Sequence, residues 1–165
     1  MTSRMRGALA LVSLLVGGSA IAEAQSGPMT FGPRVMYHFD SEDFGIGAMV
    51  TKPLTDAFTI APSFGYWFAG EGVTSWELNA DIHYKMPSES LSWLYLGAGL
   101  NYSNFSVDGC PAGFDCSGSD VGLNLIGGFL PASGGRIQPY AEARLYVGDG
   151  SGLSVAGGLR IPLGN

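Results

Sequence analysis

The sequence predicts an all-β fold, an eight-stranded antiparallel up-and-down transmembrane β-barrel that follows a cleaved signal peptide. Three observations lead to this prediction. Eight successive runs alternate between large apolar side chains and small or polar ones, which is the period of a β-strand. The chain of 165 residues is 46% hydrophobic and 13% charged, and 26 of its residues are glycine. Past the N-terminus no apolar run is long enough for a membrane helix, so only a closed barrel could cross a bilayer.

The composition excludes several classes of protein. A charged fraction of 13% is roughly half the usual share, and both a disordered chain and the surface of an ordinary soluble domain need more charge. The formal net charge of −6 argues against nucleic acid as a partner. The length is sufficient for one domain.

The N-terminus has the three parts of a secretory signal peptide. Arg4 and Arg6 form a basic start, residues 7–17 contain no charge, and Ala22-Glu23-Ala24 places small residues where a signal peptidase reads them. The apolar run is too short to span a bilayer, which takes about 20 residues. We therefore expect residues 1–24 to be the signal peptide and residues 25–165 to form the barrel domain.

The first four expected strands are residues 31–39, 44–51, 58–68 and 76–86. Large apolar side chains occupy every second position in each of them. The apolar faces are, in order, Phe31, Pro33, Val35, Tyr37 and Phe39; Phe44, Ile46, Ala48 and Val50; Phe58, Ile60, Pro62, Phe64, Tyr66 and Phe68; and Trp76, Leu78, Ala80, Ile82, Tyr84 and Met86. Pro62 cannot donate a hydrogen bond to a neighbouring strand, so we expect a local bulge or break there.

The last four expected strands are residues 93–103, 121–129, 137–147 and 153–163. Their apolar faces are Leu94, Leu96, Ala98, Leu100 and Tyr102; Val121, Leu123, Leu125 and Phe129; Ile137, Pro139, Ala141, Ala143, Leu145 and Val147; and Leu153, Val155, Leu159, Ile161 and Leu163. Gly127 interrupts one apolar face, and Pro139 predicts a second bulge or break. Eleven residues tilted by about 40° rise roughly 28 Å, which fits an apolar band of about 25 Å.

The composition of the second face indicates that it points inward. It is rich in Gly, Ala, Ser and Asn, as the interior of a narrow barrel requires, and it carries a few large aromatic residues. These aromatic residues are Trp67, Trp93, Tyr95, Tyr140 and Tyr146. Aromatic residues near the ends of the runs suggest girdles at the two membrane interfaces: Phe31, Phe39, Phe44, Phe58, Phe68, Trp76, Tyr84, Tyr102, Phe105 and Phe129. A soluble barrel that carries an apolar ligand alternates in the same way with its faces reversed, and stays open as an alternative.

The connections alternate in charge along the chain. Those after the odd-numbered strands carry acids without Lys or Arg, and we expect them to be external: Asp40, Glu42, Asp43, Glu71, Asp108, Asp115, Asp120 and Asp149. The other connections contain turn residues together with Lys52 and Arg136, and we expect them on the periplasmic side.

On this architecture, which covers residues 30–163, the chain resembles the small eight-stranded outer-membrane barrels, the family of the outer membrane protein A transmembrane domain and outer membrane protein X. The resemblance implies a location in the cell outer membrane, contact with outer-membrane lipid and lipopolysaccharide, and a non-enzymatic role in envelope structure or in surface contacts through the loops. We expect a monomer with no cofactor and no metal site. A narrow ion-conducting, porin-like pore is a further alternative.

Seven charged residues fall on the inward face and form the first candidate site: Arg34, Glu77, Asp81, Lys85, Glu142, Arg144 and Arg160. Isolated buried charges are costly, so we expect them to pair. Glu77 is placed to meet Arg144, and Arg34 and Arg160 to share Glu142 or Asp81. The set is either a fixed plug that fills the lumen or, as the resemblance allows, a switchable gate.

Cys110 and Cys116 lie in the longest connection, and in an oxidising compartment we expect them to form a disulfide. Catalysis has little support, because both His38 and His83 fall on the inward face. A lipid A deacylase-type enzyme would carry His and Ser on the wall that faces lipid. We therefore predict no catalytic residue.

Overall fold

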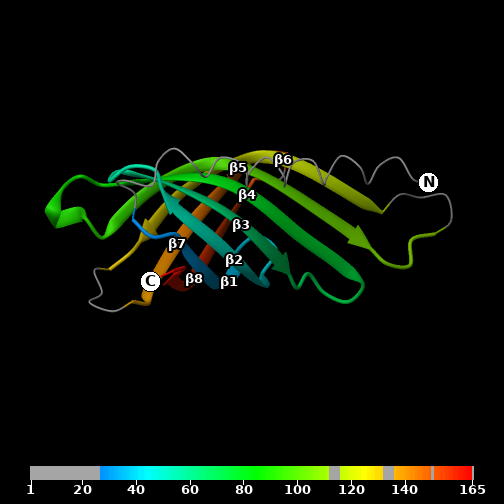
Figure 1. Ribbon diagram of the computed structural model, residues 1–165. Coiled ribbons are helices and arrows are strands. Elements are labelled where there is room, and N and C mark those ends of the chain that lie inside the picture. Colours follow the sequence, from blue (N-terminus) through cyan, green and yellow to red (C-terminus); the bar gives the residue numbers. More distant parts are fainter. Residues whose placement is uncertain (1–26, 112–115, 132–135, 150, 165) are drawn as a thin grey trace, which may run out of the picture.

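The computed structural model describes residues 27–111, 116–131, 136–149 and 151–164, and the predicted signal peptide, residues 1–24, lies outside these ranges. The described chain forms a closed barrel in which each strand is antiparallel to its two neighbours and β8 pairs with β1 (Figure 1). This confirms the predicted fold class. The strands are β1 (Thr30–His38), β2 (Asp43–Pro53), β3 (Phe58–Trp67), β4 (Val73–Lys85), β5 (Leu94–Val107), β6 (Ser117–Phe129), β7 (Gln138–Val147) and β8 (Gly152–Pro162).

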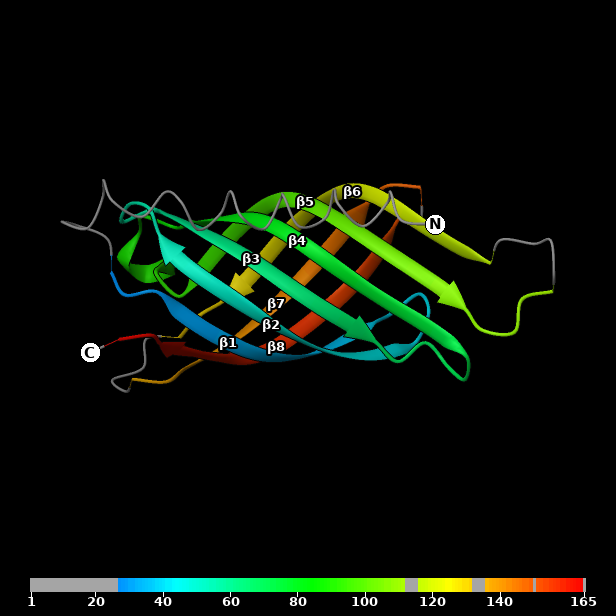
Figure 2. The same cartoon turned by 45° about the vertical axis from the view of Figure 1, so that its right-hand side comes forward.

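The two ends of the barrel carry different connections (Figure 2). We call one end the turn end; it holds the start of β1, the end of β8 and the connections after β2, β4 and β6. The end that holds the connections after β1, β3, β5 and β7 is called the loop end. The turn end includes a short 3-10 helix, η1 (Glu89–Leu91), between β4 and β5. No helix in the described part of the chain is long and apolar enough to cross a membrane.

Local sequence explains how the strands are connected. In the β2–β3 turn, the hydroxyl of Thr55 accepts hydrogen bonds from the amides of Ala57 and Phe58 at 3.2 and 3.0 Å, as turn threonines commonly do. In the β3–β4 connection, Gly70 and Gly72 adopt φ values of 94° and 74°, which favour glycine because it has no Cβ.

The alternating pattern assigns the two faces of the wall as predicted. The outward side chains are exposed and apolar, with Phe44 at 66% and Val121 at 64% exposure. Outward aromatic rings contact one another near both ends of the barrel, in the pairs Tyr37–Phe44, Tyr66–Phe68 and Trp76–Tyr102 toward the loop end and Phe58–Tyr84 and Trp93–Phe129 toward the turn end. The buried side chains point into the lumen and are mostly polar or charged.

The two prolines at which a bulge or break was expected, Pro62 and Pro139, interrupt hydrogen bonding less than expected. The β2–β3 ladder skips two residues on each strand between the pairs Met49↔Ser63 and Lys52↔Ile60, so Pro62 causes a break without a bulge. The register is therefore the same on both sides of the break. Pro139 pairs with Leu159 in an uninterrupted β7–β8 ladder, and the β6–β7 ladder has already ended at Phe129↔Ala141. The bulge or break predicted at Pro139 is absent from these ladders.

The β5–β6 hairpin extends further than the predicted runs. β5 continues to Val107 and β6 begins at Ser117, so Asp120, expected in a loop, lies inside a strand. In the extension of β5 the apolar residues Phe105 and Val107 fall on the lumen-facing register, and the polar Asn104 and Ser106 fall on the outward one. The alternation of the rest of the wall is therefore reversed there. Trp93, expected on the inward face, precedes β5, and its ring contacts the outward Phe129 with centroids 5.3 Å apart.

Candidate functional site

Two arginines from opposite sides of the barrel closure meet one glutamate inside the lumen. Arg34 on β1 donates from Nη1 to Oε1 of Glu142 at 3.1 Å, and Arg144 on β7 donates from Nη2 to the same oxygen at 3.2 Å. Arg144 Nη2 also donates to Oδ2 of Asp81 on β4 at 2.9 Å. The side chains of Arg34 and Glu142 are each 1% exposed. Charges buried this deeply need such pairing, because removing one partner leaves an uncompensated ion.

An asparagine ladder continues the network across β4, β5 and β6. Asn101 and Asn124 donate to Oδ1 of Asn79 at 2.7 and 2.8 Å, and Asn124 also donates to Oδ1 of Asp81 at 2.9 Å. These amides donate hydrogen bonds to oxygens of Asn79 and Asp81 that accept none from the arginines. The three asparagines were not predicted as part of the network, although each occupies an inward position on one of three adjacent strands.

Glu77 lies nearer the loop end and has partners other than the one expected. Trp67 Nε1 donates to its Oε2 at 3.2 Å, Asn79 donates to its Oε1 at 3.0 Å, and Arg34 Nη2 lies 3.7 Å from Oε1. The expected pair of Glu77 and Arg144 is not formed, and Arg144 Nη2 contacts Asp81 and Glu142 instead.

Arg160 and Lys85 lie outside this network, toward the turn end. Arg160 was expected to share Glu142 or Asp81, but its guanidinium lies between the rings of Tyr95 and Tyr140, at 5.1 and 5.2 Å from their centroids. Within the described ranges, neither Arg160 nor Lys85 has a carboxylate within ion-pair distance. In the described part of the chain, Arg160 has no carboxylate partner because of its place on β8. It lies two residues beyond Gly158, which pairs with Arg34, and is therefore nearer the turn end than the network.

Glycines make room for these large side chains. Asp81 is paired with Gly99, Glu77 with Gly65, and Tyr95 with Gly128 on the neighbouring strand. A Cβ added at Gly99 would lie 2.2 Å from Oδ1 of Asp81 and 2.4 Å from the carbonyl oxygen of Ala80. The abundance of inward glycine therefore follows from charged and aromatic side chains lying across the adjacent strand.

Two polar cavities lie on either side of the network. The cavity at the loop end is about 270 Å³ and is bordered by Arg144, Asn124 and Glu77. The cavity at the turn end is about 310 Å³ and is bordered by Arg160 and His83. Arg34, Asp81 and Glu142 border neither cavity, which places them between the two. The arrangement can fill the lumen while leaving a polar vestibule at each mouth.

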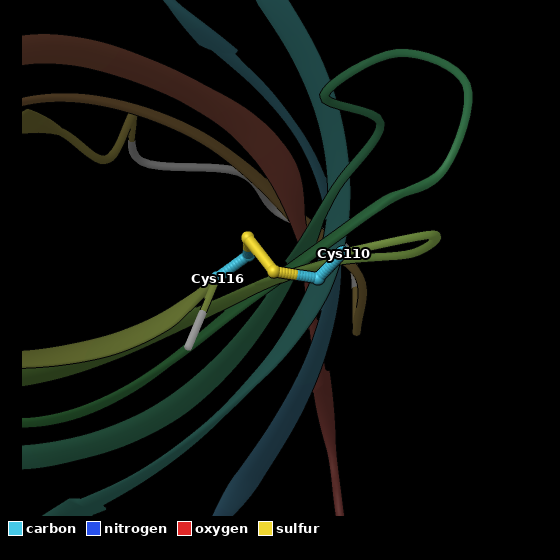
Figure 3. Close-up of a disulfide and its surroundings, with 2 residues drawn as sticks. All are labelled: Cys110 and Cys116. Carbon is cyan, nitrogen blue, oxygen red and sulfur yellow. A yellow bond between two sulfur atoms is a disulfide. The ribbon is translucent and has the colours of Figure 1, made fainter. Parts of the chain in front are cut away.

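The cysteines form the predicted disulfide, which bridges the ends of β5 and β6 (Figure 3). The Cα atoms of Cys110 and Cys116 are 5.9 Å apart, and the amide of Val107 donates to the carbonyl oxygen of Cys116 at 3.0 Å. The disulfide therefore closes the β5–β6 ladder where its backbone hydrogen bonds end.

Both histidines face the lumen at opposite ends. His38 Nδ1 lies 4.0 Å from Oδ2 of Asp40 at the loop end. His83 stacks on the ring of Tyr95 at a centroid distance of 4.7 Å. The acids expected in external loops lie at the loop end where they are described, and Asp115 lies outside the described residues.

Comparison with known proteins places this geometry among solved barrels. No protein-family model and no curated protein matches the sequence. The N-terminal β-barrel domain of Pseudomonas aeruginosa OprF is similar in structure, with a TM-score of 0.66 and 15% identity over 84% of this chain and 98% of that one. Neisserial surface protein A gives a TM-score of 0.59 at 15% identity, over 84% of this chain and 96% of that one. The de novo designed TMB2.3 gives 0.50 at 16% identity, over 87% and 99%. The chain thus has the fold of the small eight-stranded outer-membrane β-barrels.

Proposed function

We propose that this chain is a non-enzymatic integral protein of the outer membrane, with a lumen closed by its own side chains and a structural or surface-contact role. One observation carries the proposal: an apolar, aromatic-edged outer wall surrounds an interior held by a cross-barrel ion network. Lipid satisfies the outer wall, and the closed sheet leaves no strand edge without hydrogen bonds. The structural likeness to OprF and Neisserial surface protein A supports this setting.

The two ends support an orientation. The acids of the loop end, among them Asp40, Glu71, Asp108 and Asp149, would face outward beside anionic lipopolysaccharide, where divalent cations can bridge the two. The turn end, which holds the start of β1 and the end of β8, would face the periplasm. One of the structural neighbours is named as a surface protein, Neisserial surface protein A, and this likeness supports a role at the cell surface.

The soluble carrier of an apolar ligand is the weaker alternative. Such a barrel needs an apolar interior and a wet outer face. The charged side chains of Arg34, Asp81 and Glu142 are buried in the lumen, and the large apolar side chains are exposed on the wall. The two faces are therefore arranged in the opposite way to those of a soluble carrier.

A narrow ion pore is the second candidate, and the two polar cavities favour keeping it. The 270 and 310 Å³ cavities open toward opposite ends, and the network lies between them together with buried side chains such as Met49. An eight-stranded barrel is wide enough for side chains alone, so conduction would require these side chains to move.

The experiment that tests the proposal is electrophoresis of the purified barrel, refolded in detergent, with and without boiling. A closed transmembrane barrel resists cold SDS and changes mobility when it is heated, and we expect this shift. A protein that shows no shift and stays soluble without detergent would contradict the membrane location and favour the carrier. Reconstitution into planar bilayers then separates a closed lumen from a pore.

A further inference from the structure

The cavity at the turn end is built differently from the rest of the lumen. Its volume is about 310 Å³, and cationic and polar side chains gather on it from three strands: His83 and Lys85 from β4, Gln138 from β7 and Arg160 from β8. Trp93 and Leu130 add an apolar border. A cavity of this size with a few convergent polar groups fits the lower end of the range for small-ligand sites.

Arg160 is buried at this cavity without hydrogen-bond partners for two of its nitrogens. The residue is 8% exposed, and its Nε and Nη2 atoms have no partner among the described residues. The rings of Tyr95 and Tyr140 contact the guanidinium at 5.1 and 5.2 Å, a cation–π arrangement that supplies no acceptor to the N–H groups. Buried N–H groups of a charged side chain are costly to leave unpaired.

The carboxylates of the described lumen are already engaged elsewhere. Glu142 accepts from Arg34, Arg144 and the hydroxyl of Tyr95, the last at 2.9 Å. Asp81 accepts from Arg144 and Asn124. Among the described residues, the inward cations without a carboxylate within ion-pair distance are Lys85 and Arg160, and both lie at the turn end.

His83 adds a second group without a partner. It is 3% exposed, neither ring nitrogen has a hydrogen-bond partner among the described residues, and its ring stacks on Tyr95. Its N–H is thus a further donor bordering the same cavity. The loop end, in contrast, is acidic, so an anion would enter this lumen from the turn end.

We propose that the turn-end cavity binds a phosphate-class oxyanion, held by the guanidinium of Arg160 with Lys85, His83 and Gln138 around it. The planar guanidinium fork matches a phosphate oxygen pair, and Lys85 supplies a point charge. The apolar border at Trp93 and Leu130 leaves room for an organic group attached to the phosphate. The phosphate is either a free ion or ester, or the headgroup of a lipid at the barrel mouth.

The test measures binding of inorganic phosphate to the refolded barrel in a maltoside detergent, by calorimetry and by tryptophan fluorescence, to which Trp93 contributes. We expect saturable binding that Arg160→Gln weakens about tenfold or more, as the loss of a charged hydrogen-bond donor predicts. Lys52→Gln is the matched control, because it removes a cation near the same end from a residue that does not border the cavity. Its binding should equal that of the unchanged protein.

Lys85→Gln keeps the test decisive if Arg160→Gln does not fold. Lys85 is exposed at the end of β4, so its removal should leave the heat-induced gel shift intact while weakening phosphate binding about threefold or more. A short-chain phosphatidic acid serves as the lipid arm, and tighter binding of it than of phosphate would identify the headgroup as the source. Absence of binding of either probe to the unchanged barrel, or equal binding by the Lys85, Arg160 and Lys52 variants, would overturn the proposal.

Discussion

At the scale of single residues, the interior depends on pairing one large inward side chain with a glycine on the next strand. Tyr95 lies over Gly128, where an added Cβ would come within 1.9 Å of the ring carbon Cζ. Tyr95 in turn donates to Glu142 and stacks on His83. The glycine thus determines the position of an aromatic ring that connects the central network with the turn-end cavity.

Gly128→Ala should destabilise the barrel by about 1–3 kcal/mol, the usual cost of overpacking, because Tyr95 must move. Gly127→Ala is the control, since the neighbouring glycine points outward and an added Cβ meets nothing within 4 Å. Urea unfolding in detergent compares the two variants. Equal loss of stability would show that strand propensity, and not the ring contact, sets the need for glycine.

Arg144→Met should lower the free energy of unfolding by about 3–5 kcal/mol, because it leaves Asp81 with a buried negative charge and no cation, while Glu142 keeps only Arg34. The double variant Arg144→Met/Asp81→Asn should regain part of this loss. Arg136→Met, at an exposed position, is the control. An unfolding midpoint unchanged by Arg144→Met would contradict the network's role in stability.

At the scale of elements, the β5–β6 hairpin joins two of the three longest strands and ends in the disulfide. Its outer part projects past the predicted apolar runs. β4 accompanies β5 as far as Val107, but β6 extends beyond β7, because the β6–β7 ladder begins only at Leu123↔Val147. The outer part of β6 has fewer contacts to hold it, so its stability differs from that of the barrel wall. The disulfide constrains this end.

Cys110→Ser/Cys116→Ser should therefore act locally. We expect amide hydrogen exchange at Val107, which bonds to Cys116, to lose up to about 2 kcal/mol of protection, the chain-entropy value for so short a loop. The amide of Leu100, further along β5, should keep its protection, and the heat-induced gel shift should remain. A uniform loss of protection along β5 would show instead that the disulfide stabilises the whole barrel.

The alternation in the sequence was sufficient to predict the strands and their faces, because each strand lies between lipid-facing and lumen-facing sides. It failed where the apolar residues change faces, at Phe105 and Val107 on the lumen-facing register, and the extension of β5 to Val107 was missed for that reason. The inward charges were predicted in the same way, but their partners were not. Whether Arg144 meets Glu77 or Asp81 depends on the stagger between β4 and β7, which no local pattern contains. The position of Arg160 between two tyrosines depends on the same stagger.

At the scale of the whole molecule, a layer of paired charges lies between two polar vestibules, beside the buried cluster of Met49, Ala61 and Tyr140. The layer consists of side chains from β1, β4 and β7, so it holds the wall together from the inside across strands that are distant in sequence. The same layer fills the space that an ion would cross. Stability and closure of the lumen therefore depend on the same residues.

Single-channel recording in planar bilayers tests this link between the network and closure. The unchanged barrel should show no steady conductance above that of the bare bilayer, because Arg34, Glu142 and Arg144 occupy the path between the two cavities. Arg34→Ala/Arg144→Ala should join the cavities and produce conductance, provided that the heat-induced gel shift shows the variant to be folded. Lys85→Ala, at the mouth, is the control and should remain closed. Steady conductance of the unchanged barrel would identify the layer as a gate that opens without mutation, and the chain as a narrow pore.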